Sequence, residues 1–236
     1  MTHPRFYLTA NLNGPTAELL GPEAHHLHNV MRLQPGDEIE LFDGDGTEAT
    51  ARVESASKKR VVVSILSRQP GAAELPAPLV LATAVPKGDR FRWLVEKATE
   101  LGVTRLVPLQ TERSVVDPRA TKLEKMRAAV IAASKQCRRA QLMEITPLQN
   151  WSEFLTSLPA SDPLFIAHPG GAAWRADWVA GDQPTVICIG PEGGFSDVEI
   201  SLANARATLV DLGPRILRIE TAALALVALC GASLRS

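Results

Sequence analysis

The stretch that decides the fold reads Ile189-Gly190-Pro191-Glu192-Gly193-Gly194-Phe195-Ser196. Further along the chain a second turn reads Leu212-Gly213-Pro214-Arg215-Ile216-Leu217-Arg218-Ile219-Glu220-Thr221-Ala222. A run of aliphatic and β-branched residues precedes each turn (185–189 and 208–212), and a helical pattern follows each one. A strand, a glycine-rich turn and a helix start form the ligand-binding corner of many α/β proteins. The two turns together therefore predict one ligand pocket.

A third strand end belongs to the same predicted pocket, and it reads Ala167-His168-Pro169-Gly170-Gly171. Ligands of open α/β sheets bind beyond the carboxyl ends of the strands, so we expect the three loops to converge. The sequence contains neither G-x-x-x-x-G-K-[ST] nor G-x-G-x-x-G. This absence argues against a P-loop nucleotide site and against a Rossmann-type dehydrogenase.

Strand and helix patterns alternate along the rest of this half of the chain. Apolar runs predict strands, and amphipathic segments predict helices, over 79–85, 90–101, 103–109, 118–139, 163–167, 185–189, 196–206, 208–212 and 219–234. Uninterrupted apolar strands between helices indicate a parallel sheet that is covered on both faces. We therefore expect an α/β domain over residues 79–236.

Residues 1–70 show a different pattern, in which short strands are joined by tight turns. Segments 38–42, 48–53 and 60–66 have strand character, Asp43-Gly44-Asp45-Gly46 signals a hairpin, and 22–33 has helical spacing. These features predict a small β-barrel. Three prolines in 69–78 and the absence of periodicity there place a linker at 71–78.

The net charge of −1 suggests no anionic partner, but the distribution of charge does. Residues 87–141 carry thirteen Lys and Arg against six Asp and Glu, whereas the flanking segments are acidic. A basic segment of this kind is typical of a nucleic-acid contact, although solvated helix faces produce it too.

Three widely spaced cysteines, Cys137, Cys188 and Cys230, form no C-x-x-C pair, which favours a reducing compartment without disulfides or zinc. His25, His26 and His28 lack a neighbouring carboxylate or cysteine to complete a site, so no metal is expected. With neither a signal peptide nor a membrane-spanning run in the sequence, the expected location is cytoplasmic.

The two quoted turns resemble the signature of the RsmE family, ribosomal RNA small-subunit methyltransferases of the SPOUT superfamily. Other stretches agree in order along nearly the whole chain, among them Lys87-Gly88-Asp89, Glu112-Arg113-Ser114 and Ala132 to Arg139. Two positions depart from the family pattern, because Lys135 replaces an acidic residue and Arg138 replaces a glycine.

The resemblance implies a PUA-like RNA-binding barrel over 1–70 and a SPOUT domain over 79–236 that ends in a trefoil knot. It also implies S-adenosylmethionine (SAM) as methyl donor, a homodimer, and N3-methylation of a uridine in 16S ribosomal RNA. The residues expected to bind SAM are Ala167, His168, Ile189, Gly190, Pro191, Gly193, Gly194, Leu212, Gly213, Arg215, Ile216, Leu217 and Ala222.

Methylation of uridine N3 needs a group that accepts the N3 proton and a donor for the developing oxyanion. Among the carboxylates Glu192 and Glu220 and the cations Arg215 and Arg218, we assign catalysis to Arg218 and Glu220. Arg218 orients the substrate or stabilises the oxyanion, and Glu220 is the base or its partner. Two alternatives remain: Glu220 caps the last helix and pairs with Arg218, or His168 is the base.

Phosphates of the RNA are expected to contact basic residues of both domains, namely Arg5, Arg32, Lys87, Arg90, Arg113, Arg138 and Arg139. Another SPOUT activity, ribose 2′-O-methylation, is the alternative reaction, because the cofactor loops say little about the acceptor atom. A ribosome-assembly factor that binds RNA without catalysis is the alternative outside enzymes.

Overall fold

The computed structural model describes residues 3–118, 120–179, 182–203 and 205–234. The chain divides into two compact units, and each is described here by itself. The first unit comprises Met1–Glu74 and Ser134–Leu142, and the second comprises Leu75–Ala133 and Met143–Ser236. The basic segment that the sequence places wholly in the α/β domain therefore contributes its last eight residues, 134–141, to the first unit.

The first unit is built on a curled, barrel-like sheet of five strands in the order β1-β3-β4-β5-β2. These strands are β1 (Arg5–Tyr7), β2 (Thr16–Leu20), β3 (Glu38–Phe42), β4 (Thr47–Ala56) and β5 (Arg60–Pro70). Alternating side chains such as Leu41, Val53 and Val63 fill its core. The sequence does not reveal β2, because Leu19 is the one buried side chain in its five residues.

The helix predicted over 22–33 is shorter and less regular than expected. Helix α1 covers Gly21–His25, and a π-helical turn, η1, continues over His26–Met31. Arg32 then ends the helix with a left-handed φ of 56°. Within the described ranges no group of three or more His, Cys, Asp or Glu side chains is arranged to hold a metal ion.

The second unit contains a seven-stranded parallel sheet in the order β12-β10-β11-β6-β7-β8, with β9 also paired to β7. Its strands are β6 (Leu79–Ala84), β7 (Arg105–Gln110), β8 (Glu144–Ile145), β9 (Gln149–Asn150), β10 (Leu164–Ala173), β11 (Thr185–Ile189) and β12 (Ala207–Asp211). Every residue of the central strands β6 and β11 is buried. The predicted α/β domain with a covered parallel sheet is confirmed.

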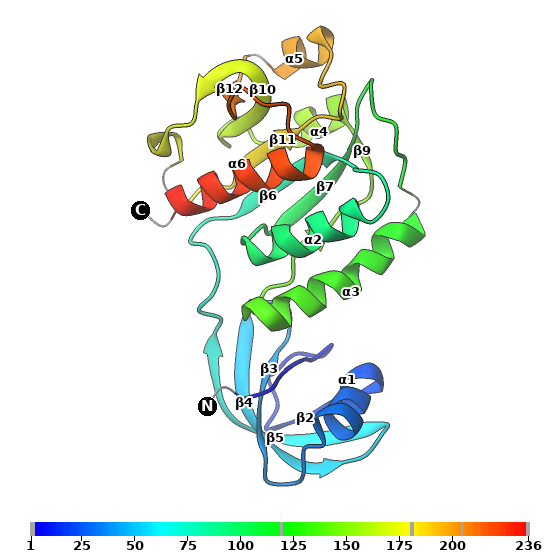
Figure 1. Cartoon of the computed structure of the whole chain (residues 1–236). Helices are drawn as coiled ribbons and strands as arrows, with labels where there is room; N and C mark the ends of the chain where they lie inside the picture. Colours follow the sequence, from blue (N-terminus) through cyan, green and yellow to red (C-terminus); the bar gives the residue numbers. More distant parts are fainter. Residues whose placement is uncertain (1–2, 119, 180–181, 204, 235–236) are drawn as a thin grey trace. The chain divides into compact units, whose positions relative to one another are not determined.

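Helices cover both faces of this sheet. On one face α2 (Arg90–Glu100) and α6 (Ile219–Ser233) lie side by side, and α6 packs on β6 and β11 (Figure 1). On the other face Val80 and Cys188 of the sheet share a core with α4 (Trp151–Ser157) and α5 (Asp197–Ala203). The remaining helices are α3 (Ala120–Cys137) and the short η2 (Ala176–Trp178).

Strand β10 differs most from its prediction, since it extends well past Ala167. Its register against β12 shifts between Ala167 and Ala172, so residues 168–171 form a bulge within the strand. Gly171 is required there, because an added Cβ would lie 2.6 Å from the carbonyl group of Leu209. The bulge, rather than a loop beyond the strand, carries His168.

No helix in the part of the chain that the structure describes is both long and apolar enough to cross a membrane. The trefoil knot stays a prediction.

Candidate active site

The predicted loops all leave the same edge of the sheet. Strands β10, β11 and β12 are parallel, and β10 lies between the other two. The loop after β11 (residues 190–195, the glycine loop) and the loop after β12 (residues 212–218, the entry loop to α6) therefore flank the bulge of β10. The sequence-based expectation that the three segments converge agrees with this strand order.

Neighbouring side chains of the protein account for two glycines of the glycine loop. A Cβ added to Gly190 would lie 3.0 Å from the ring of Phe195, and one added to Gly193 would lie 3.2 Å from Cδ of Arg113. Gly194 has a φ of 69°, a conformation that side chains rarely adopt. The sequence alone attributes these glycines to close approach of a ligand, whereas two of them leave room for neighbouring side chains.

The glycine loop is tied to the turn that follows β7. Arg113 Nη1 donates to the carbonyl oxygen of Gly193 at 2.7 Å. Glu199, on α5, accepts from the backbone N–H of Ser196 at 2.9 Å and from that of Glu112 at 2.8 Å. Sequence reasoning missed Glu199, although Ser196-x-x-Glu199 is a capping-box signal at the start of a helix.

The entry loop to α6 is far more open. Asp211 Oδ1 accepts from the N–H of Gly213 at 2.8 Å, and Gly213 has a φ of 100°. The side chain of Ile216 is 100% exposed, and Arg215 is exposed as well. Leu217 is half-buried. Exposed apolar residues beside a ligand loop are available to cover a bound ligand.

The two residues assigned to catalysis stand at the start of α6. Arg218 is exposed and immediately precedes the helix, whereas Glu220 lies in its first turn and is 5% exposed. The ion-pair partner of Glu220 is Arg90 of α2, with Arg90 Nη1 3.7 Å from Oε1. Oε2 of Glu220 is buried and has no hydrogen-bond partner among the described residues. An exposed arginine thus precedes a buried carboxylate by two residues at the start of α6.

The other residues predicted to bind the cofactor take positions around this edge. Ile189 and Pro191 are buried, and Ala167 and His168 are half-buried in β10. Nδ1 of His168 is buried and lacks a hydrogen-bond partner in the described ranges. Ala222 is half-buried in the first turn of α6. A buried imidazole nitrogen of this kind is suited to a ligand that supplies the missing polar atom.

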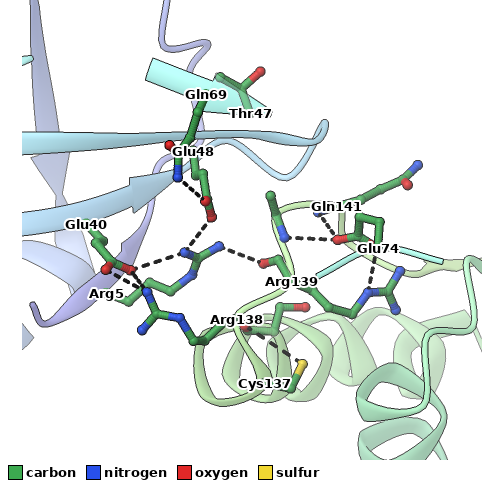
Figure 2. A network of polar contacts seen from close by, with 12 residues as sticks. Arg5, Glu40, Thr47, Glu48, Gln69, Glu74, Cys137, Arg138, Arg139 and Gln141 are labelled. Carbon is green, nitrogen blue, oxygen red and sulfur yellow. Dashed lines mark hydrogen bonds and ion pairs between the residues drawn. The ribbon is translucent and has the colours of Figure 1, made fainter. Parts of the chain in front are cut away.

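Two arginines predicted to bind RNA, Arg5 and Arg139, are instead used inside the first unit (Figure 2). Arg5 Nη1 lies 2.9 Å from Glu48 Oε2 and 3.3 Å from Glu40 Oε2, and Nη2 donates to the carbonyl oxygen of Arg139. Arg139 Nε donates to Glu74 Oε2 at 2.9 Å. Both side chains are at most 4% exposed, so they bind carboxylates of the protein rather than face solvent.

The two departures from the family pattern are also occupied by ion pairs. Lys135 Nζ lies 2.9 Å from Glu23, and Arg138 Nη2 donates to Glu40 at 2.6 Å. The hydrogen bond to Glu40 raises the pKa of Arg138 above its ordinary value. Arg138 has a left-handed φ of 67°, which fits the glycine found there in the family. Of the predicted RNA contacts, Arg32, Lys87, Arg113 and Arg138 are exposed.

Known protein families match this chain over most of its length. Residues 73–231 match the model of an RNA methyltransferase domain, and residues 19–66 match that of an RNA methyltransferase PUA domain. Ribosomal RNA small subunit methyltransferase E of Bacillus subtilis is 33% identical, over 89% of this chain and 87% of the relative.

Two solved structures are similar over almost their full length. A methyltransferase from Legionella pneumophila in complex with SAM is 32% identical with a TM-score of 0.86, covering 99% of this chain and 98% of the other. Ribosomal RNA small subunit methyltransferase E of Neisseria gonorrhoeae, bound to SAM, is 34% identical with a TM-score of 0.85, covering 96% and 95%. The chain belongs to the ribosomal RNA small subunit methyltransferase E family.

Proposed function

We propose that this chain transfers the methyl group of SAM to N3 of a uridine in 16S ribosomal RNA. The observation that carries the proposal is the convergence of three loops at one sheet edge, in a chain whose relatives of known structure bind SAM. Such relatives share the fold over nearly the entire length. We expect a cytoplasmic location, because the proposed substrate is ribosomal RNA.

The residues at this edge fit SAM. The glycine loop leaves free space at Gly194, where an added Cβ would meet no atom within 4 Å, so a ligand can approach the backbone there. Ile216 and Leu217 provide apolar surface for an adenine ring, and the unpartnered Nδ1 of His168 offers a polar contact. Few ionisable side chains are needed, since SAM can be held by main-chain groups and apolar contacts. We propose the same SAM-binding residues that the sequence predicts.

SAM held at this edge supplies a methyl group on sulfonium sulfur, whose S–C bond breaks as a bond to uridine N3 forms. The uridine must lose its N3 proton, and negative charge then spreads onto O2 and O4. The fork of Arg218 can donate hydrogen bonds to one of these oxygens. Glu220, with Oε2 unpartnered, accepts the proton or holds the group that does. Its burial keeps the carboxylate out of bulk water.

The RNA is expected to be held by exposed cations. Arg32 on the first unit and Lys87 and Arg113 on the second are the proposed phosphate contacts, and Arg138 and Arg90 contribute to the surrounding positive charge. Arg5 and Arg139 are left out, because their guanidinium groups are buried against carboxylates. We infer that the first unit, which includes residues 1–70, binds RNA, and the homodimer that the family resemblance implies stays a prediction.

The test is mass spectrometry of ribosomal RNA nucleosides from a strain that lacks the gene, with the purified protein added back to small subunits and SAM. The proposal predicts loss of 3-methyluridine in the strain and its return on addition of protein. Loss of a ribose-methylated nucleoside instead would reassign the acceptor atom. Unchanged nucleosides together with RNA binding would indicate an assembly factor without catalysis.

A further inference from the structure

Glu199 carries more contacts than the start of a helix requires. It is 8% exposed and lies in the first turn of α5. Ser196 Oγ accepts from the N–H of Glu199 at 3.4 Å, while Glu199 Oε2 accepts from the N–H of Ser196 at 2.9 Å. This reciprocal pair is a capping box, which satisfies two backbone donors at a helix start. It uses only one oxygen of the carboxylate.

The second carboxylate oxygen accepts a hydrogen bond from a residue outside the helix. Glu199 Oε1 accepts from the N–H of Glu112, in the turn that follows β7. That turn is closed on itself, because Ser114 Oγ accepts from the N–H of Thr111 at 3.0 Å. One buried carboxylate therefore joins two segments that are far apart in the sequence. Hydrogen bonds to a charged acceptor are stronger than those between neutral groups.

Further contacts fix the same two segments. The neighbour of Glu112, Arg113, donates to the carbonyl oxygen of Gly193 at 2.7 Å. The Trp151 indole donates to the backbone oxygen of Glu199 at 2.9 Å, and its ring lies 4.6 Å from that of Phe195. The glycine loop is thus bonded on one side and packed on the other.

We propose that Glu199 is a positioning residue that makes the glycine loop and the turn 111–114 one rigid wall of the SAM site. The inference rests on the proposed function of that site. Glu199 acts through the loop and touches neither cofactor nor RNA. Without its negative second oxygen, the bond of Arg113 to Gly193 remains, but the turn and the loop are held together less firmly. The free energy needed to order them then weakens SAM binding.

The experiment compares Glu199→Gln with Ser196→Ala. A glutamine keeps one acceptor oxygen and replaces the other with a donor, so one of the two backbone N–H groups loses its partner. We expect the KM and Kd for SAM to rise about tenfold or more, while kcat at saturating SAM changes less than about threefold. Ser196→Ala removes the capping hydroxyl but leaves both carboxylate bonds. It should lower thermal stability and change the KM for SAM less than about twofold.

A second measurement uses the wild-type protein and does not depend on the folding of any variant. Hydrogen–deuterium exchange with and without SAM should show joint protection of 110–114 and 190–199. Equal KM values for wild type and Glu199→Gln, or protection of 190–199 alone, would overturn the inference. If the wild-type protein bound no SAM, the proposed function itself would fall, and the inference would fall with it.

Discussion

The glycine loop and the entry loop to α6 leave the same sheet edge but are built in opposite ways. The glycine loop is held by Glu199, by Arg113 and by the packing of Phe195 on Trp151. Among the residues that the structure describes, the entry loop has one side-chain bond, between Asp211 and Gly213, and it presents a wholly exposed Ile216. One half of the site is therefore formed in advance, and the other half is open.

This difference predicts that one loop contributes to SAM affinity and the other to the rate of methyl transfer. A loop fixed by buried hydrogen bonds loses little conformational entropy when a ligand binds, so it contributes affinity. An open loop that ends in Arg218 and leads to Glu220 can instead adjust around the acceptor base and contribute to the rate. The comparison predicts that substitutions in the two loops separate into effects on SAM affinity and effects on turnover.

The largest expected effect comes from the open loop. Arg218→Ala removes the donor proposed to face the developing oxyanion, and kcat should fall by about 10²- to 10³-fold. The Kd for SAM should stay within about twofold, because the glycine loop is intact. Single-turnover methyl transfer on small subunits and calorimetric SAM titration measure the two quantities.

Glu220→Gln is the companion variant, since it keeps the shape of the side chain and removes its charge. We expect a similar loss of turnover if Glu220 takes the proton. Arg90→Ala tests the ion pair at 3.7 Å separately, because it removes the partner of Glu220 and leaves the carboxylate in place. RNA affinity is measured for this variant too, because Arg90 also adds to the proposed basic surface. Wild-type turnover in both Arg218→Ala and Glu220→Gln would show that the open loop has no chemical role.

An intermediate effect is expected from matched glycine–arginine pairs, one in each loop. An alanine at position 193 would press on Arg113 at 3.2 Å, whereas one at 213 would meet Arg215 only at 3.9 Å. In a double-mutant cycle on SAM affinity, Gly193→Ala and Arg113→Ala should therefore couple by about 1 kcal/mol. Gly213→Ala and Arg215→Ala should be additive, and the left-handed φ of Gly213 should appear only as lower stability.

Additivity in both cycles would mean that the contact between Arg113 and the glycine loop does not govern the site. Coupling in both would mean that the entry loop is as constrained as the glycine loop. Either result would remove the distinction between a preformed half and an open half.

Local sequence signals predict the turns at this sheet edge but not the contacts that hold them. The positions of the Gly190 and Gly213 turns follow from strand-length apolar runs that stop at glycine and proline. The reason for Gly193 lies in Arg113, which is distant in the chain and close only after folding. Glu199 is visible in the sequence as a capping box, yet its bond to Glu112 exists only in the tertiary structure.

The same limit explains the misplaced RNA contacts. Arg139 stands in the basic segment, and Arg5 lies at the start of the predicted RNA-binding barrel, so the sequence favours an exposed phosphate contact for both. Their partners Glu48 and Glu74 are far away in the chain, and pairing with them buries both guanidinium groups. Arg113, which belongs to the same basic segment, is exposed and yet bonded to the glycine loop. A sequence shows how many charged residues a segment has, but not which of them pair with other residues of the protein.

The smallest effect on stability is expected at the tip of the open loop. Ile216 is 100% exposed, so Ile216→Ala should change the free energy of unfolding by less than about 0.5 kcal/mol. Ile187 of β11, which is fully buried, is the matched control, and its replacement by alanine should cost about 2–5 kcal/mol. Urea denaturation with and without saturating SAM measures both variants.

If the open loop closes over the adenine ring, the stabilisation that SAM adds should shrink in Ile216→Ala, because part of the isoleucine surface is buried only in the complex. An undiminished effect of SAM would place Ile216 outside the cofactor site and leave the glycine loop as the main source of affinity.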